Sequence, residues 1–431
     1  MGGALRDALL GRSTTNWDLA TAALPEQTAA IFPDASYENR FGTVVLQRGG
    51  LDYEITTFRT DHDYADFRRP HRVEFGASLE ADLARRDFTM NALAWGAPDA
   101  ATAPRLVDPH DGRADIAARR IRAVGEPDRR FVEDALRMLR AVRFSATLGF
   151  EIEPATLTAI RDRAPLVAHL SGERIAVELD RILAAPRPSE GLRLLASTGI
   201  LEHVSPDLAA QRGVAQNKVE GEDLWDHTVR SVDAAAAGGA GSSRPAVRLA
   251  ALVHDIGKPA TAADGHFYRH EVVGAELAQA FLDRLHVPRS TADRVVHLVR
   301  NHMFRYEPTW SDAAVRRFLA KVGPDAIGDL FALREADNLG SGVPSDADGL
   351  TELRARIDAE LAAGPILDRS ALAIDGSDLM TELGLPEGPA LGRILAALFE
   401  RVVEEPHLND RPTLMLLARD LAARSAPEPP Q

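Results

Sequence analysis

Hydrophobic and polar positions divide the chain into a short mixed region and a long helical region. Within residues 1–100, two runs rich in β-branched residues, 43–46 and 53–58, lie among glycine-rich turns, which predicts strands beside helices. From about residue 113 onward, alanine, leucine, arginine and glutamate recur at helical spacing almost to the end. The pattern predicts an α+β protein in which a small α/β head precedes a long all-α part.

Two segments depart from the helical pattern. Residues 234–243 contain only alanine, glycine and serine, which predicts a loop inside the helical region, where insertions cost little. Residues 425–431 contain three prolines and are expected to be frayed. The chain shows no internal repeat, and its 431 residues predict two to four domains, because single cores stop growing at about 250–300 residues.

Composition narrows the class of protein. The chain is 45% hydrophobic and 26% charged, as in soluble globular proteins, and it has no signal-peptide pattern and no apolar run near the ~20 residues that span a bilayer. The absence of cysteine excludes disulfides and thiolate metal sites and favours a cytoplasmic location. Because the formal net charge is −14, any binding of RNA must depend on a local cluster of basic residues.

The N-terminal residues suit a phosphate ligand. Gly2 and Gly3 precede a predicted helix that carries Arg6. Glycine amides allow close approach of an anion, the start of a helix attracts it, and a guanidinium adds a charged fork. A glycine pair before a helix is also common in ordinary turns, so these residues are weak evidence by themselves.

A candidate metal site follows the glycine pair. Asn16 and Asp18 are alternate positions on a predicted strand, so they share a face. Two carboxylates so placed could hold two divalent ions about 3.5–4 Å apart for in-line phosphoryl transfer. Asn16 is an amide, a neutral and weaker ligand for Mg²⁺. Glu54, on a neighbouring predicted strand, is either an outer carboxylate or an exposed strand residue.

Three further motifs give the head a family resemblance. Residues 83–92 are LARRDFTMNA, residues 133–144 are EDALRMLRAVRF, and residues 172–175 are GERI. Together with the glycine pair they resemble, in order, the motifs of the class II nucleotidyltransferases, which include bacterial CCA-adding tRNA nucleotidyltransferases and poly(A) polymerases. The resemblance spans residues 2–175.

The resemblance implies a function and a role for each motif. It implies the template-independent addition of C and A, from CTP and ATP, to the 3′ end of tRNA, with Mg²⁺ as cofactor. Catalysis and Mg²⁺ binding would fall to Asp18, with Asn16 and Glu54 beside it, while residues 172–175 would brace the base-selecting motif. The implied nucleotide-binding residues are Gly2, Gly3, Arg6, Arg86, Asp87, Asn91, Asp134, Arg137, Arg140 and Arg143.

The chemistry of base selection fits two of these residues. Asp134 and Arg137 are three apart in a predicted helix and would share one face. A carboxylate accepts from an exocyclic amine, and a guanidinium donates to ring nitrogens and carbonyls. C and A both carry such an amine, whereas U does not. The alternative is an ordinary surface ion pair, worth only tenths of a kcal/mol.

Two further features of the front half have a functional and an ordinary interpretation. Residues 61–70 resemble the mobile loop that governs the family's switch from C to A addition, or form an idle solvated loop. Arginines are dense around the base-selecting motif and predict either contact with the tRNA acceptor end or a solvated helix face. They are Arg119, Arg120, Arg122, Arg129, Arg130, Arg137, Arg140 and Arg143.

The back half contains a second candidate metal site. His254 and Asp255 are adjacent in an apolar helical stretch, where their burial is costly unless they hold a metal. With His227 upstream and Asp337 downstream, they resemble the ligand set of HD phosphohydrolases. Mixed imidazole and carboxylate ligands suit a divalent transition metal such as Mn²⁺, Ni²⁺ or Co²⁺.

The HD resemblance implies hydrolysis of phosphomonoesters or 2′,3′-cyclic phosphates. Lys258 could neutralise charge there, and His270 and His302 are candidates for a second metal site. The expected domains are a nucleotidyltransferase head (1–112), a helical neck and body (113–214), an HD domain (215–345) and a helical tail (346–431).

Two departures from the family leave alternatives open. The family places a helix and a strand before the glycine pair, so the head is expected to be shortened at its N-terminus, and it has aspartate at the position of Asn16. Both departures favour an alternative in which the head is an inactive RNA- or nucleotide-binding module and the HD domain is the working enzyme. Poly(A) addition is a second alternative, disfavoured by the complete HD set and the acidic tail. The oligomeric state stays open.

Overall fold

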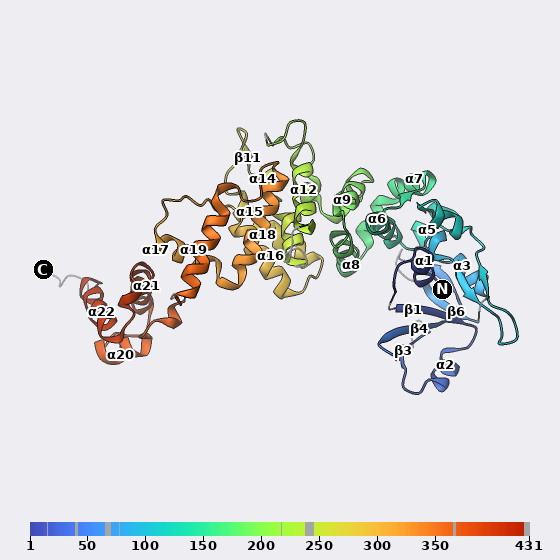
Figure 1. Cartoon of the computed structure of the whole chain (residues 1–431), viewed down its shortest axis with the longest axis horizontal. Helices are drawn as coiled ribbons and strands as arrows, with labels where there is room; N and C mark the ends of the chain where they lie inside the picture. Colours follow the sequence, from blue (N-terminus) through green and yellow to red (C-terminus); the bar gives the residue numbers. More distant parts are fainter. Residues whose placement is uncertain are drawn as a thin grey trace.

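The protein is an elongated α+β molecule with a sheet-containing head at one end and helices along the rest (Figure 1). The computed structural model describes residues 1–14, 16–38, 42–64, 70–76, 78–216, 218–237, 245–364 and 368–425. The side chains of residues 16, 38, 60–64, 70–74 and 425 also lie outside the description. The structure confirms the predicted order of a small mixed head followed by helices.

The head is built on a mixed four-stranded sheet of order β1-β4-β3-β2. Strand β1 runs parallel to β4, and the other neighbours are antiparallel. The β1–β4 register pairs Asp18 with Glu54, as the sequence predicted for neighbouring strands. The elements are α1 (Gly3–Leu9), β1 (Asn16–Thr21), α2 (Pro25–Ile31), β2 (Ser36–Glu38), β3 (Thr43–Arg48) and β4 (Leu51–Thr57).

A hairpin and short elements complete the head. Residues 65–69 of the segment 61–70 that resembles a mobile loop lie outside the described residues, and the residues on either side form the hairpin β5–β6. The elements are β5 (Arg59–Tyr64), β6 (Pro70–Phe75), α3 (Leu79–Ala84), the 3₁₀ turn η1 (Thr89–Asn91), β7 (Ala94–Gly96) and β8 (Arg105–Val107).

A helical neck follows the head. Gly149 follows the last residue of α6, and its φ of 68° is the left-handed conformation typical of a helix C-terminus. The elements are α4 (Gly112–Ala117), β9 (Arg120–Ile121), α5 (Pro127–Glu133), α6 (Leu136–Leu148), β10 (Glu151–Ile152), α7 (Pro154–Arg163), η2 (Ala164–His169), α8 (Gly172–Leu183), α9 (Pro188–Ser197), α10 (Leu201–Val204) and α11 (Pro206–Ala209).

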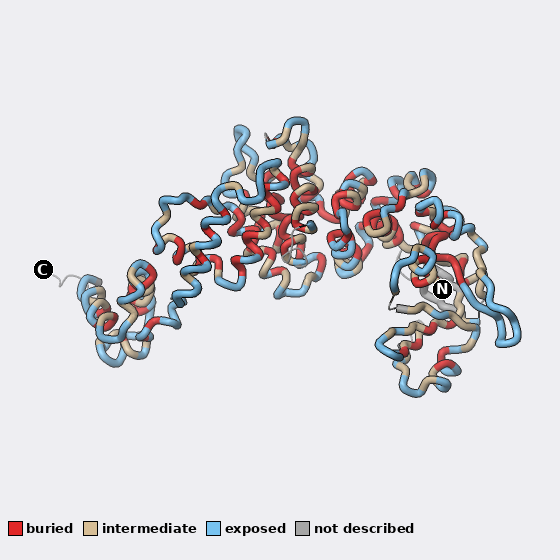
Figure 2. The backbone as a smooth tube through the Cα atoms, viewed as in Figure 1, coloured by how far each residue is buried: buried red, intermediate tan, exposed pale blue. Residues whose placement is uncertain are grey.

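The central helices form the most heavily buried part of the chain (Figure 2). The prediction of a loop at 234–243 is wrong for residues 234–237, which continue α12 because alanine is the best helix former. Residues 238–244 lie outside the description. The elements are α12 (Leu224–Ala237), α13 (Pro245–Val253), α14 (Lys258–Thr261), β11 (Ala262–Ala263), β12 (His266–Phe267), α15 (His270–Arg284), α16 (Arg289–Asn301), α17 (Asp312–Val322) and α18 (Pro324–Gly340).

The C-terminal helices have a small core of their own, formed by residues such as Leu379, Leu398 and Leu414. The buried Arg316 of α17 ties this unit to the body, because its guanidinium donates to the carbonyls of Val403 (2.7 Å) and Glu404 (2.9 Å). The elements are η3 (Ala347–Gly349), α19 (Leu350–Ala362), η4 (Arg369–Ala371), α20 (Gly376–Leu383), α21 (Pro389–Glu404), η5 (Pro406–Leu408) and α22 (Arg411–Ser425). No described helix has the length and apolarity required to cross a membrane.

Candidate functional sites: a nucleotide cavity and a histidine–aspartate centre

A cavity of about 890 Å³ lies between the head and the neck. Nine arginines and four aspartates make up its charged lining, so the cavity suits a polyanion in spite of the negative total charge. Most of the predicted nucleotide-binding residues meet there, although they come from α1, η1, α6 and the segments between. Those that line it are Gly3, Arg6, Arg86, Asp87, Asn91, Asp134, Arg137, Arg140 and Arg143, and the predicted metal ligand Asp18 lines it as well.

Asp18 lines this cavity. Burial raises the pKa of Asp18, and the neighbouring charge of Glu54 raises it further. The N-terminal amine, Arg86 and Arg6 offset part of this negative charge, and a divalent cation beside the two acids would offset more of it. Gly2 has a φ of 67°, a backbone conformation that favours glycine, and a Cβ atom there would displace the Arg86 guanidinium. The Asn16 side chain lies outside the described residues.

The motif at 83–92 forms a hydrogen-bonded cluster around Asn91. The Asn91 amide donates to Asp87 Oδ1 (3.1 Å), and Arg6 of α1 donates to Asn91 Oδ1 (2.7 Å). Arg140 of α6 donates to Asp87 Oδ2 at 2.7 Å. Burial by itself would raise the pKa of Asp87, but the Arg140 charge and hydrogen bonds from Asn91, Arg140 and the Phe88 amide hold it far below its ordinary value. Asp87 is therefore an ionised acceptor fixed inside the cavity.

Asp134 and Arg137 both line the cavity, but the prediction that they share one helix face is wrong. Helix α5 ends at Glu133, and Asp134 has an extended backbone (φ −150°, ψ 106°) before α6 begins. Arg174 of α8 donates to both oxygens of Asp134 (2.8 and 3.0 Å). Arg137 instead lies 2.8 Å from Glu133. In the described structure the Asp134 and Arg137 side chains therefore do not pair with each other. Both line the cavity, and each is held by a different partner.

Many of the arginines around the base-selecting motif have acidic partners within the protein. Glu133 pairs with Arg129, Arg130 and Arg137. The remaining pairs are Arg120 and Arg122 with Asp115, Arg140 with Asp87, and Arg143 with Glu178. The proposed contact of these arginines with tRNA stays a prediction.

Phe144 was not singled out as a site residue by the sequence, yet it anchors three guanidiniums. The guanidinium carbons of Arg6, Arg140 and Arg143 lie 4.9, 5.4 and 4.1 Å from the centre of its ring. Burial lowers the pKa of Arg143 to about 10, and the charge of Arg140 adds to this effect. The aromatic face holds these like charges close together, an arrangement that favours an anion in the cavity.

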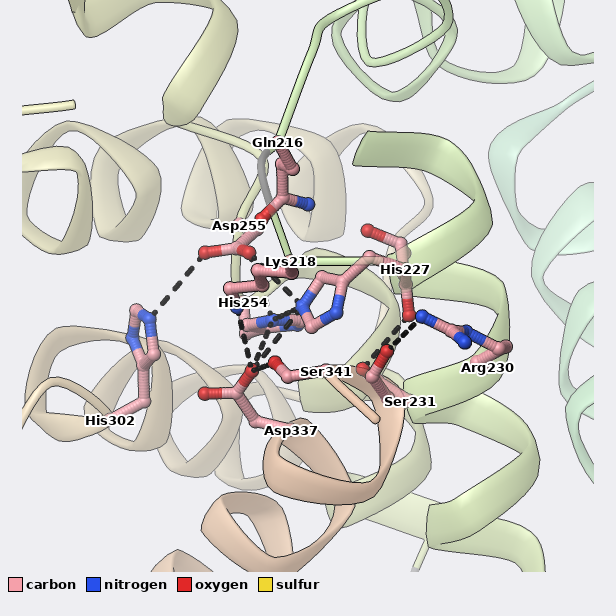
Figure 3. Close-up of polar contacts among 12 residues, drawn as sticks. Gln216, Lys218, His227, Arg230, Ser231, His254, Asp255, His302, Asp337 and Ser341 are labelled. Carbon is pink, nitrogen blue, oxygen red and sulfur yellow. Dashed lines mark hydrogen bonds and ion pairs between the residues drawn. The ribbon is translucent and has the colours of Figure 1, made fainter. Parts of the chain in front are cut away.

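The predicted HD residues converge in the centre of the body (Figure 3). His227 comes from α12, His254 and Asp255 follow the end of α13, and Asp337 lies near the end of α18. All four side chains are at least nine-tenths buried. Helix packing thus brings together residues separated by up to 110 positions in the sequence.

The distances within this centre suit metal coordination. His227 Nε2 lies 3.3 Å from Asp255 Oδ2 and 3.3 Å from Asp337 Oδ1, and 3.1 Å from His254 Nε2. On the other side, Asp255 Oδ1 lies 3.3 Å from His270 Nε2 and 3.7 Å from His302 Nε2. Asp255 therefore lies between two candidate sets, His227–His254–Asp255 and Asp255–His270–His302.

The tautomers of three of these histidines are set for metal binding. The Nδ1 atoms of His254, His270 and His302 lie 2.9, 2.8 and 2.6 Å from the carbonyls of Ala251, Phe267 and Val299. A carbonyl only accepts, so Nδ1 carries the hydrogen and the Nε2 lone pair points into the centre.

Two further observations support the fit. The buried Nε2 atoms of His270 and His302 make no hydrogen bond within the described structure. Burial lowers the pKa of His254 and favours its neutral form, which is the form that binds a metal. The donor set fits a divalent transition metal.

Basic side chains surround the centre. Lys258 Nζ lies 2.6 Å from Asp255 Oδ2 and donates to Gln216 at 3.1 Å, in agreement with its predicted role in neutralising charge. Lys218 and Arg334 donate to Asp337 at 3.4 and 3.0 Å. The sequence did not single out these two residues, because no local spacing relates them to the HD motif.

Comparison with known proteins assigns the family. Over 412 residues the chain is 36% identical to a CCA-adding enzyme of Geobacillus stearothermophilus, covering 95% of this chain and 90% of that protein. A CCA-adding enzyme of Streptococcus thermophilus is 33% identical over 96% of this chain and 90% of its own length. The chain belongs to the CCA-adding enzyme and poly(A) polymerase family. It is thus a nucleotidyltransferase.

Family profiles and solved structures agree with this membership. The profile described as "Poly A polymerase head domain" matches residues 1–122, "Probable RNA and SrmB- binding site of polymerase A" matches 149–212, and "tRNA nucleotidyltransferase domain 2 putative" matches 271–418. The Bacillus stearothermophilus CCA-adding enzyme in complex with CTP has a TM-score of 0.71 and 33% identity, and the alignment covers 98% of this chain and 93% of that one.

A more distant structure shows the same fold. The Thermotoga maritima CCA-adding enzyme complexed with tRNA_CCA is 18% identical with a TM-score of 0.55, over 99% of this chain and 90% of that chain. None of the three profile descriptions above names an HD domain. For this member of the CCA-adding enzyme family, the histidine–aspartate centre therefore rests on its geometry alone, and the predicted domain boundaries stay predictions.

Proposed function

We propose that this chain adds C and A nucleotides, from CTP and ATP, to the 3′ end of tRNA without a nucleic-acid template. The observation that carries the proposal is one cavity whose lining includes Asp18, the hydrogen-bonded Asp87 and Asn91, and the Asp134 and Arg137 side chains. Glu54 lies opposite Asp18 on the neighbouring strand, and Arg174 holds Asp134. Relatives more than 30% identical over nearly the whole chain are CCA-adding enzymes, and one of them was solved with CTP.

Each part of the cavity has a role in this reaction. Asp18, with Glu54 beside it, would hold Mg²⁺, which supplies charge stabilisation at the reacting phosphate. Arg6 and the glycine pair would receive the triphosphate, and Asp87 and Asn91 would orient the ribose. The tRNA 3′-hydroxyl oxygen forms a bond to the α-phosphorus, and pyrophosphate leaves.

Base choice would depend on Asp134 and Arg137. The Asp134 carboxylate accepts from the exocyclic amine of C or A, and the Arg137 guanidinium donates to the ring nitrogen or carbonyl. Arg174 holds both Asp134 oxygens, so the acceptor is positioned before the nucleotide arrives. U offers a carbonyl at the position of that amine, where it would meet a second acceptor.

The direct test is incubation of the protein with tRNA that lacks CCA, labelled CTP and ATP, and Mg²⁺. We expect products longer by three nucleotides, and their length separates CCA addition from poly(A) addition. A protein that binds CTP and tRNA but extends nothing would favour the alternative of an inactive nucleotide-binding head.

Replacement of Asp134 by alanine tests base selection. We expect relaxed choice among CTP, ATP and UTP together with a lower rate, because a paired base contact discriminates by about 1–3 kcal/mol. The measurement is kcat/KM for each nucleotide. Asp128→Ala is the matched control, since Asp128 is an exposed acid that pairs with Arg163 on the neck surface. Selectivity unchanged in a still active Asp134→Ala protein would contradict the assignment.

We propose in addition that the histidine–aspartate centre is a metal-dependent phosphohydrolase site for phosphomonoesters or 2′,3′-cyclic phosphates. The observation that favours it is the convergence of four histidines and two aspartates with three Nε2 lone pairs directed inward. His227, His254, Asp255 and Asp337 would hold one ion, and Asp255, His270 and His302 a second. A bound transition metal would lower the pKa of a water and polarise the phosphate, while Lys258 would balance the charge of Asp255.

A further inference from the structure

A buried acid that the proposed reaction does not use lies beside the nucleotide cavity. Asp115 of α4 is fully buried, and its two oxygens have three donors. Arg120 Nε donates to Oδ1 at 2.7 Å, Arg122 Nε donates to Oδ2 at 2.8 Å, and the Thr89 hydroxyl donates to Oδ2 at 2.6 Å. A buried carboxylate is costly unless it is paired in this way, so its contacts fix the positions of all three donors.

The contact with Thr89 reaches the ribose-orienting residues. Thr89 begins the 3₁₀ turn η1, which ends at Asn91, and the Asn91 amide donates to Asp87 at 3.1 Å. The packing around this turn is close, since a Cβ atom on Gly112 would overlap the Thr89 carbonyl oxygen. The turn has little freedom, because Asp115 accepts from the Thr89 hydroxyl on one side and Gly112 packs against the Thr89 backbone on the other.

The contacts with the two arginines reach the segment that leads to the base-selecting residues. The Thr89 amide donates to the Arg122 carbonyl (2.9 Å), and the Val124 amide donates to the Asp87 carbonyl (3.1 Å). Three residues after Val124, α5 begins at Pro127 and leads directly to Asp134. Asp115 thus connects the segment that carries Asp87 and Asn91 to the segment that leads to Asp134.

We infer that Asp115 is a positioning residue for ribose recognition, acting through the Thr89 hydroxyl. This inference rests on the proposed function, because it assigns the ribose to Asp87 and Asn91. Asp115 lies behind the turn and does not line the cavity, so it need not touch the nucleotide. Its expected effect is on the discrimination between ribonucleotides and 2′-deoxyribonucleotides, and not on triphosphate binding through Arg6.

Two substitutions at Thr89 isolate this contact. Thr89→Val removes the hydroxyl at nearly constant volume and leaves Asp115 with both arginines, whereas Thr89→Ser keeps the hydroxyl. Asp115→Asn is the complementary variant. Thr198→Val is the matched control, because Thr198 is also buried and its hydroxyl donates to the carbonyls of Leu194 (2.6 Å) and Leu195 (3.3 Å) at the end of α9 in the neck.

The measurement is the ratio of the dissociation constants of dCTP and CTP for the full chain with Mg²⁺ and without tRNA, so that no turnover is needed. We expect Thr89→Val and Asp115→Asn to lower this ratio by about tenfold, since displacement of a positioned group by about 1 Å can cost up to ~10²-fold. Thr89→Ser and Thr198→Val should keep the ratio of the unmodified protein.

Two outcomes would overturn the inference, and they differ in what else they overturn. If the unmodified protein prefers CTP and a folded Thr89→Val protein keeps that preference, Asp115 has no positioning role and the proposed function is untouched. If the unmodified protein binds CTP and dCTP equally, the assignment of the ribose to Asp87 and Asn91 fails as well.

Discussion

Replacement of Asn16 by aspartate is expected to raise nucleotide incorporation by about 100-fold or more. Positions 16 and 18 are alternate residues of β1, and Asp18 has Glu54 opposite it on β4. A second carboxylate on this strand strengthens the binding of divalent ions, and metal stabilisation of the transition state is worth several kcal/mol, with about 1.36 kcal/mol for each factor of ten.

The assay is incorporation of labelled CMP into tRNA lacking CCA, at several Mg²⁺ concentrations. Asn16→Gln is the matched control, because it keeps the amide and should not raise the rate. Asp18→Asn in the Asn16→Asp background should return the rate to the starting level or below. A folded Asn16→Asp protein with an unchanged rate would show that the amide at this position does not limit the reaction.

Replacement of Asp255 is expected to abolish both the bound transition metal and the phosphohydrolase turnover. Asp255 lies between the two candidate ligand sets, so a single substitution removes a ligand from each. Nucleotide addition should persist, because Asp255 and Asp18 share no ligand and distant sites behave nearly additively. The measurements are metal content by elemental analysis and hydrolysis of a 2′,3′-cyclic nucleotide with Mn²⁺, Ni²⁺ or Co²⁺.

The choice of variant matters here because of Lys258. Asp255→Ala would leave the buried Lys258 ammonium without its carboxylate at 2.6 Å, and an unpaired buried charge is strongly destabilising. Asp255→Asn keeps the shape and an acceptor oxygen, so it tests the same point with less risk to folding. Asp293→Asn, at an exposed acid of α16, is the matched control.

The outcomes separate the two proposed activities. If the unmodified protein hydrolyses none of these substrates with any of the three metals, the centre has a structural role. Loss of nucleotide addition in a folded Asp255→Asn protein, with hydrolysis intact, would contradict the division of labour between the two sites. His302→Gln removes a ligand from one set alone and should lower the metal content without abolishing it.

The order of the elements and many of the side chains that meet at each candidate site could be predicted from the sequence. The strand runs at 43–46 and 53–58 and the helical pattern after residue 113 depend on local periodicity, which a single chain displays directly. The residue types of the motifs also carry their chemistry, since a His-Asp pair in an apolar stretch needs a metal or other partners wherever it lies.

The pairing of the residues was decided by the tertiary structure. Asp134 and Arg137 are three residues apart, so helical periodicity predicts that they share one face. In the folded chain α5 ends before Asp134, and the partner of Asp134 is Arg174, 40 residues away. Asp255 likewise lies between two candidate ligand sets, because helices far apart in the sequence bring His227, His270 and His302 to it. Such contacts depend on how helices meet, and local sequence does not encode the distance between elements far apart in the chain. The chain by itself therefore determined which groups were available, and packing determined which of them act together.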